Sequence, residues 1–67
     1  MVSWFMVEEI LGQWVVSPRY NTTGAREILH RMAADLGLKQ GTGECSYVAA
    51  TYDDAHSLAL MAGSEVL

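Results

Sequence analysis

The chain has little of what disulfide bonding, membrane insertion or nucleic-acid binding requires. Cys45 is the only cysteine among 67 residues, so no intramolecular disulfide can form, which fits a reducing compartment. Four Lys or Arg residues stand against eight Asp or Glu, and the formal charge of −4 argues against general binding to phosphate backbones. The apolar N-terminal stretch lacks a basic flank, and Glu8 and Glu9 interrupt it before it could span a membrane. We therefore expect a cytoplasmic protein that does not associate with membranes.

Motifs for catalysis and metal binding are also missing. Nucleophilic catalysis needs a thiol or hydroxyl beside a base, and the candidates His30, Cys45 and His56 are scattered singly along the chain. They lack the paired spacing that is typical of zinc ligands, and the adjacent Asp53 and Asp54 are not spaced like a calcium loop. The sequence predicts no catalytic residue, no metal site and no cofactor.

The length predicts a single domain over residues 1–67 with a thin core. A chain of this size buries only about 60% of the surface that its unfolded form exposes. Apolar residues make up 51% of the sequence, which is a high share for so short a chain. Either the interior is unusually well filled, or some apolar surface is covered by a second chain, for example in a homodimer.

The clearest helical pattern lies between Thr22 and Leu38. Its apolar residues fall on one continuous stripe of a helix, namely Ala25, Ile28, Leu29, Met32, Ala33 and Leu36. Thr22 or Thr23 can cap the first turn. Gly37 can take the left-handed conformation that ends a helix, with Leu38 folding back as the hydrophobic contact of a Schellman motif.

The N-terminal third predicts a β-hairpin. Residues 3–10 and 13–18 are rich in aromatic and β-branched side chains, which favour strands. A helix is the alternative for the first segment, with a stripe made of Trp4, Val7, Ile10, Leu11 and Trp14. Gly12 favours the hairpin, because glycine fits a tight turn and weakens a helix.

The segment after the central helix predicts a loop and a third strand. The loop covers residues 39–43, and its two glycines lead into strand-like sequence instead of a helix, which argues against a phosphate-binding loop. Residues 45–51 alternate in a way that indicates a strand with small side chains.

A second helix is predicted over residues 52–62. Thr51 and Asp54 resemble a capping box, and Gly63 marks the expected end. The predicted buried face consists of Ala55, Leu58, Ala59 and Ala62. Leu60 falls on the opposite side, where it is either an ordinary exposed residue or part of a contact surface.

The order of these elements predicts a small β-β-α-β-α domain of the α+β class. We expect a three-stranded sheet with two helices packed on one face. A right-handed crossover follows if strands two and three are adjacent and parallel. The other face would carry some of the aromatic residues Trp4, Phe5, Trp14 and Tyr47, and would be the place for a dimer mate or partner to dock.

Charge is distributed unevenly along the chain. The four basic residues lie between positions 19 and 39: Arg19, Arg26, Arg31 and Lys39. After them come four carboxylates with no basic residue to balance them: Glu44, Asp53, Asp54 and Glu65. These carboxylates predict an acidic flank that would steer the protein towards a basic surface. With His56 and Leu60 nearby, they are the predicted partner-binding residues.

The sequence thus favours a non-catalytic protein-interaction module whose partner has a basic surface. By analogy of size and charge, it fits small phage or mobile-element inhibitors, including anti-CRISPR proteins. The alternative is a homodimeric nucleic-acid-binding or regulatory module that uses Arg19, Arg26 and Arg31, with Tyr20 available to stack on a base. The acidic balance of the chain makes nucleic acid the less favoured partner.

Overall fold

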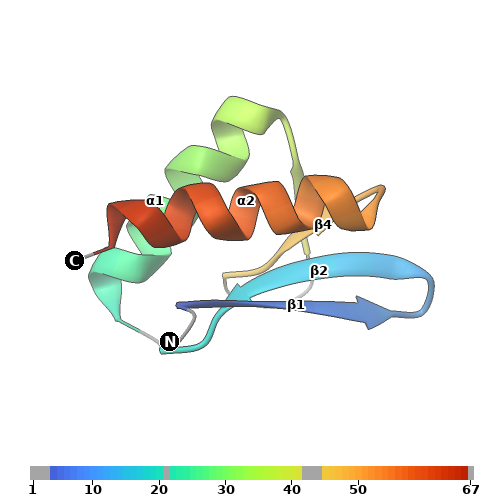
Figure 1. The fold of residues 1–67 in the computed structure, drawn as a ribbon, viewed down its shortest axis with the longest axis horizontal. Coiled ribbons are helices and arrows are strands. Elements are labelled where there is room, and N and C mark those ends of the chain that lie inside the picture. The colour runs from blue at the N-terminus through green and yellow to red at the C-terminus, as the bar shows by residue number, and fades with distance from the viewer. Residues whose placement is uncertain (1–3, 21, 42–44, 67) are drawn as a thin grey trace.

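The computed structural model describes residues 4–20, 22–41 and 45–66, and it shows an α+β fold with a four-stranded antiparallel sheet and two helices (Figure 1). In chain order the elements are β1 (Phe5–Ile10), β2 (Gln13–Pro18), α1 (Thr23–Leu36), β3 (Lys39–Gln40), β4 (Tyr47–Ala49) and α2 (Tyr52–Glu65). The α+β class predicted from the sequence is confirmed. The predicted strand count of three is wrong, because β3 forms within the segment expected to be a loop.

The N-terminal hairpin forms as predicted. β1 and β2 pair antiparallel, and the register that places Ile10 opposite Gln13 leaves a two-residue turn. Leu11 and Gly12 both have positive φ, 52° and 81°, as a type I′ turn requires. The strands exclude the alternative helix for this segment.

α1 has the two caps expected of it. The Thr22 hydroxyl accepts a hydrogen bond from the Ala25 amide at 3.2 Å. At the other end, Gly37 has a φ of 71°, and the amide of Leu38 donates to the Ala33 carbonyl at 3.0 Å. This is a Schellman motif. Leu36, predicted to belong to the buried stripe, is 43% exposed, because the chain turns at Gly37 and Leu38 packs against the core instead.

The strand order, β1-β2-β4-β3, corrects the predicted topology. β2 and β4 are neighbours, but they pair antiparallel. α1 carries the chain from β2 to β3, and these two strands are parallel because each pairs antiparallel with β4. The crossover through α1 therefore connects two parallel strands that are not neighbours. β4 follows β3 in the chain and occupies the position between β2 and β3.

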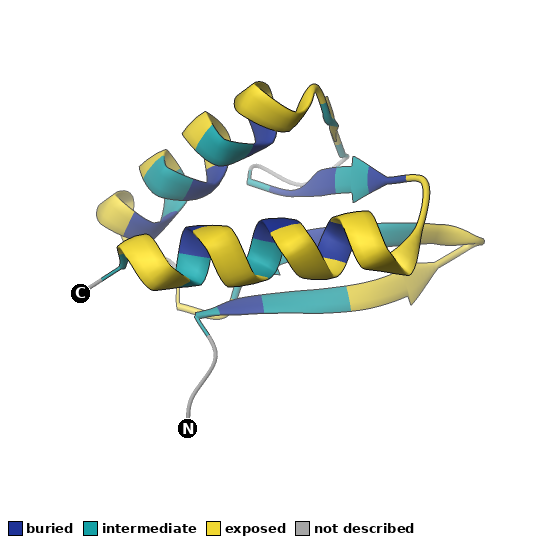
Figure 2. Cartoon of the chain, turned by 45° about the horizontal axis from the view of Figure 1, so that its top comes forward, coloured by how far each residue is buried: buried dark blue, intermediate teal, exposed yellow. Residues whose placement is uncertain are grey.

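α2 is capped by the Thr51 hydroxyl, which accepts from the Asp54 amide at 3.2 Å. The helix continues through Gly63 to Glu65, past its predicted end. No positive φ interrupts the helix at Gly63, so this glycine does not act as the cap. Figure 2 shows the pattern along the helix: a buried side and an exposed side alternate with each turn.

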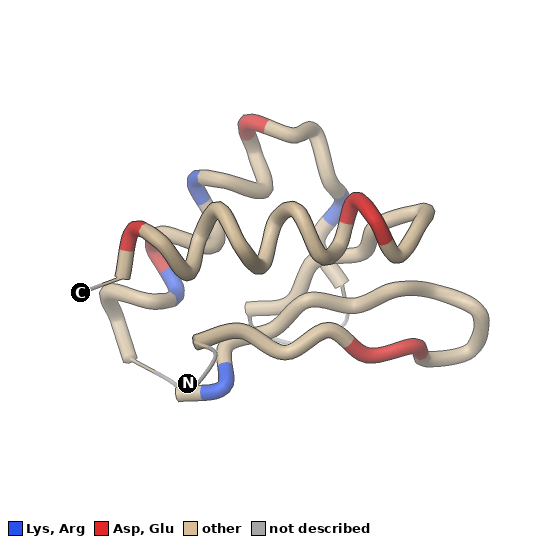
Figure 3. Tube along the Cα trace, viewed as in Figure 1, with Lys and Arg blue, Asp and Glu red and all other residues tan. Residues whose placement is uncertain are grey.

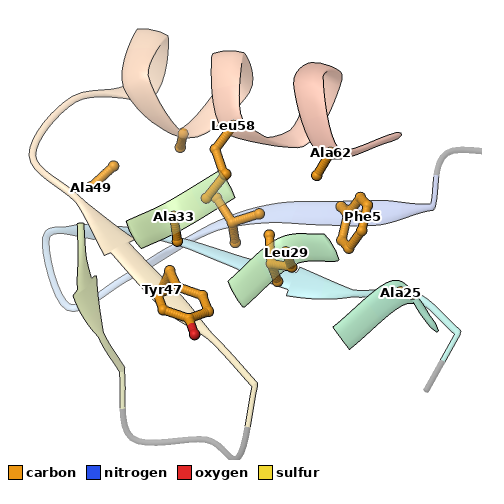
Figure 4. Packing of buried hydrophobic residues seen from close by; sticks show 10 residues of the cluster. Phe5, Ala25, Leu29, Ala33, Tyr47, Ala49, Leu58 and Ala62 are labelled. Atoms are coloured by element: carbon orange, nitrogen blue, oxygen red, sulfur yellow. The ribbon is translucent and has the colours of Figure 1, made fainter. Parts of the chain in front are cut away.

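The core lies between the two helices and one face of the sheet, and its largest fully buried side chains are Leu29, Leu58 and Val16 (Figure 4). Four alanines contribute to it from the helices: Ala25, Ala33, Ala55 and Ala62. Their small side chains let the backbones approach closely.

The aromatic residues expected on the uncovered face lie elsewhere. The strand register sets Val16 opposite Tyr47, and both are buried under the helices together with Phe5. Trp14 and Trp4 pack against the same core from its edges. The prediction failed because the face of a strand residue is set by its pairing register, and alternation alone does not say which face the helices cover.

Candidate functional site

α2 carries most of the predicted partner-binding residues on its solvent side. Asp53, His56 and Leu60 are exposed and are spaced i, i+3 and i+7, so they form one row opposite the buried Leu58. Leu60 is 61% exposed. The structure thus brings these three residues together on one surface.

The other predicted partner-binding residues separate from this row. Asp54 is exposed in the first turn of α2, on the flank of the row. Glu65 is in the last turn, and a helical rise of about 1.5 Å per residue puts it roughly 18 Å from Asp53. Glu44 lies outside the described residues.

Aromatic contacts fix the start of α2 on the sheet. The ring of Tyr52 meets Trp14 of β2 edge to face, with centroids 5.1 Å apart. The same ring stacks on His56 at a centroid distance of 5.4 Å, and the Tyr52 hydroxyl lies 3.5 Å from His56 Nδ1. Tyr52 remains 47% exposed, so it links β2 to the outer row and also faces solvent.

β1 adds the carboxylate of Glu9 to this end of the molecule. Glu9 is paired in register with Trp14, whose ring touches Tyr52, so Glu9 lies on the helix side of the sheet at the same end as the start of α2. Figure 3 shows the acidic positions of β1 and of the start of α2 at the same end of the fold, which is the end that carries the hairpin turn. We call the set Glu9, Tyr52, Asp53 and Asp54 the acidic end. The N-terminal dipole of α2 stabilises the two aspartates there.

Sequence reasoning missed Glu9 as a member of this site. The hairpin prediction already placed residues 8 and 9 next to the turn. The sequence does not reveal the tertiary contact between Trp14 and Tyr52, which brings the hairpin and α2 together. No local pattern encodes that contact.

The basic residues of the alternative function do not share a surface. Arg26 and Arg31 are both on α1, but five positions correspond to a rotation of about 140° around a helix of 3.6 residues per turn. Arg26 is half-buried and Arg31 is exposed. Arg19 is exposed just after the end of β2. Arg26 and Arg31 therefore point to different sides of α1, and the three arginines do not form one row.

Cys45 is held against the backbone of α1. Its Sγ lies 3.8 Å from the Arg26 carbonyl oxygen, to which the thiol donates. Burial raises the pKa of the Cys45 thiol, and the positive charge of Arg26 opposes this only in part. Within the described part of the chain, no hydrogen bond joins Cys45 to either imidazole; His30 Nδ1 is bonded to the Tyr47 hydroxyl, and His56 stacks on Tyr52. Among these described residues, Cys45 is thus not paired with an imidazole that could activate it.

No group of three or more His, Cys, Asp or Glu side chains is arranged to hold a metal ion among residues 4–20, 22–41 and 45–66. Over the same ranges, no helix has the length and apolar character needed to cross a bilayer.

The face of the sheet opposite the helices contains a shallow hollow of about 620 Å³. Strand residues whose side chains alternate with the buried ones form its floor and walls. They include Glu8, Ile10, Gln13, Val15, Ser17, Lys39 and Val48, with Leu11 of the turn at the rim. We call this surface the open face.

Comparison of the chain with protein-family models, curated proteins and solved structures gives no significant match.

Proposed function

We propose that this protein is a non-catalytic interaction module of the cytoplasm, and that its acidic end binds a basic surface on another protein. The observation that supports this best is the contact between the Trp14 ring of β2 and the exposed Tyr52 ring of α2. It brings Glu9, the register partner of Trp14, to the same end of the fold as Asp53 and Asp54. A patch that combines carboxylates with an exposed aromatic ring suits recognition of Lys- and Arg-rich surfaces.

The neighbouring row on α2 extends this surface with an apolar anchor. Leu60 is 61% exposed and lies one turn beyond His56. Tyr52, which stacks on His56, is 47% exposed. Tyrosine contributes strongly at the centres of protein interfaces, whereas the charged rim mainly sets the association rate and the choice of partner. The carboxylates would attract the partner, and the two apolar side chains would hold it.

A non-catalytic role agrees with the surroundings of the Cys45 thiol and of the His30 and His56 imidazoles. The raised pKa of Cys45 keeps its thiol protonated at neutral pH, and neither His30 nor His56 is placed to deprotonate it. Small size and an acidic binding surface also fit a phage or mobile-element inhibitor of the anti-CRISPR kind, which is one setting for the proposed partner.

The proposal is tested by reversing the charge of the acidic end. The variant D53K/D54K is compared with wild type and with E27K/D35K, which changes charge equally on the exposed surface of α1. Each tagged protein is used to capture partners from a lysate of the native host, followed by quantitative mass spectrometry. The captured protein is then purified and titrated. We expect its affinity to fall at least tenfold for D53K/D54K at physiological salt and to stay unchanged for E27K/D35K.

Fold and partner class are checked in the same series. D53N/D54N removes the charges with little change in shape, and circular dichroism establishes that each variant is folded. A partner that binds all variants equally would contradict the proposal. Direct titration with single- and double-stranded nucleic acid covers the alternative: binding at physiological salt that is lost when Arg19, Arg26 and Arg31 are neutralised would favour a nucleic-acid-binding module.

A further inference from the structure

The open face carries one row of side chains that crosses all four strands. The register sets Glu8 opposite Val15, Val15 opposite Val48, and Val48 opposite Lys39. Side chains directly opposite each other point to the same face, so the row reads acid, valine, valine, base from one edge of the sheet to the other. It passes through the middle of the hollow, whose lining includes all four residues.

The two charges at the ends of this row cannot neutralise each other within one chain. They are three strand spacings apart, about 14 Å at roughly 4.8 Å per spacing. Both side chains are exposed. The two valines between them are partly exposed and offer an apolar centre.

This row is complementary to itself. A two-fold axis that runs parallel to the strands, between Val15 and Val48, turns the sheet over and exchanges its edges. Glu8 of each protomer then faces the partner's Lys39, and Val15 faces the partner's Val48. An axis across the strands would instead bring the two copies of Glu8 together, which like-charge repulsion disfavours.

We propose that the open face is a homodimer interface in which a second copy of the chain docks face to face about this axis. Two ion pairs would flank a centre of four valines, in an isologous interface of stacked, aligned sheets. The proposal does not depend on the proposed function, because the acidic end lies on the side of the sheet that carries α2.

Leu11 provides a second, independent observation. Its side chain is 98% exposed at the rim of the hollow, and its φ of 52° is a conformation that disfavours residues other than Gly, Asn and Asp. Asparagine would suit this turn better and would not expose an apolar side chain. A leucine that is both strained and exposed fits a residue that is covered in the dimer.

The dimensions of the face predict weak association. β1 and β2 have six residues each, β3 has two and β4 has three, and at the usual spacings these strands cover roughly 270 Å² per protomer. Standard interfaces bury about 800 Å² per partner. We therefore expect a dissociation constant in the micromolar range, about 10 to 500 µM.

A charge-swap experiment tests both the partner and the axis. Sedimentation equilibrium over about 5 µM to 1 mM gives the dissociation constant of each protein. E8K and K39E each put like charges opposite one another and should weaken the dimer at least tenfold. The double variant E8K/K39E restores both pairs and should dimerise like wild type. A mixture of the two single variants should form a heterodimer, because each then meets the opposite charge.

Two further variants keep the test independent of folding and of the acidic end. L11N should raise the melting temperature at low concentration yet weaken dimerisation. E9K makes the same charge change one residue from Glu8 but on the helix side of the sheet, so it should leave the dimer intact while weakening binding to a basic partner. A chain that stays monomeric to 1 mM, a dimer that E8K does not affect, or single variants that fail to associate when mixed would each overturn the proposal.

Discussion

The Tyr47 hydroxyl shares a hydrogen bond with Nδ1 of His30 and so joins the middle of the sheet to α1. The tyrosine ring is buried, with 4% of its surface exposed, whereas His30 is exposed on the helix. The two rings lie 5.8 Å apart at a tilt of 52°. The hydroxyl of the buried Tyr47 is thus hydrogen-bonded to a residue at the protein surface, so burying this side chain leaves no unsatisfied hydroxyl.

Removing this hydroxyl should cost a measurable part of the stability. For Tyr47→Phe we expect a decrease of about 1 kcal/mol in the free energy of unfolding at pH 7, because the ring is kept and only the hydrogen bond is lost. Tyr52→Phe is the matched control, since its hydroxyl is exposed and 3.5 Å from His56, and it should change stability by less than about 0.5 kcal/mol. Urea unfolding followed by circular dichroism measures both, and equal values for the two variants would contradict the role of the bond.

The same tyrosine should make the fold sensitive to alkali. Burial raises the pKa of Tyr47, with a further contribution from the nearby Cys45, so the folded state keeps a proton that the unfolded state loses. The stabilising effect is complete below the unfolded pKa, about 10, and is lost as the pH rises through the higher folded pKa. Cys45, whose pKa is also raised by burial, acts in the same direction from about pH 8.5.

We therefore expect the free energy of unfolding of the wild-type chain to decline from about pH 8.5 to 11, and the decline to be smaller in Tyr47→Phe. Urea titrations at a series of pH values measure it. Cys45→Ala separates the contribution of the thiol. Stability that stays flat or rises over this range would contradict the burial of both groups.

The two leucines of α2 allow a direct test of its buried and exposed sides. Leu58 is fully buried, and Leu58→Ala should cost about 2 to 5 kcal/mol. A domain of this length has about 3 to 10 kcal/mol in all, so the variant should be close to unfolded at 25 °C. Leu60→Ala on the exposed side should stay within about 0.5 kcal/mol of wild type. Thermal unfolding of the two variants compares them, and a large loss for Leu60→Ala would mean that this side is covered by another chain.

Replacing Gly37 or Gly63 with alanine should change the stability of the fold in opposite directions. Gly37 has a φ of 71° in the Schellman motif, and Gly37→Ala should cost about 1 kcal/mol because a Cβ disfavours that conformation. Gly63 is inside α2, where an added Cβ would meet nothing within 4 Å, and Gly63→Ala should stabilise the fold by about 0.5 to 1 kcal/mol. Denaturant midpoints of both variants give the signs, and the same sign for both would refute the assignment of the caps.

Local signals in the sequence predicted the elements that depend on local interactions. Thr22, Gly37 and Thr51 each carry a cap whose hydrogen bonds form within a few residues, and all three are found where they were expected. The hairpin follows from Gly12, which suits the left-handed second position of the turn. Half of the apolar stripe of α1 is buried, and Ile28 and Met32 are partly buried, for the same reason, since a helical period needs only neighbouring turns.

The remaining features depend on contacts between segments far apart in the chain. β3 consists of Lys39 and Gln40, which have no strand-like pattern and become a strand only by pairing with β4. The antiparallel pairing of β2 with β4, and the burial of Phe5 under the helices, follow from register and packing. The position of Glu9 at the same end of the fold as the start of α2 likewise depends on the contact between Trp14 and Tyr52. No pattern of spacing within one element reports such contacts.

The position of β4 has a consequence for how the protein folds. This three-residue strand is made after both of its neighbours, yet it lies between them. Until residues 47–49 are inserted, β2 has one unpaired edge and β3 has no strand beside it. The last strand to be synthesised therefore joins two strands that are already made, and the segment of α1 and β3 becomes part of the sheet only when β4 pairs.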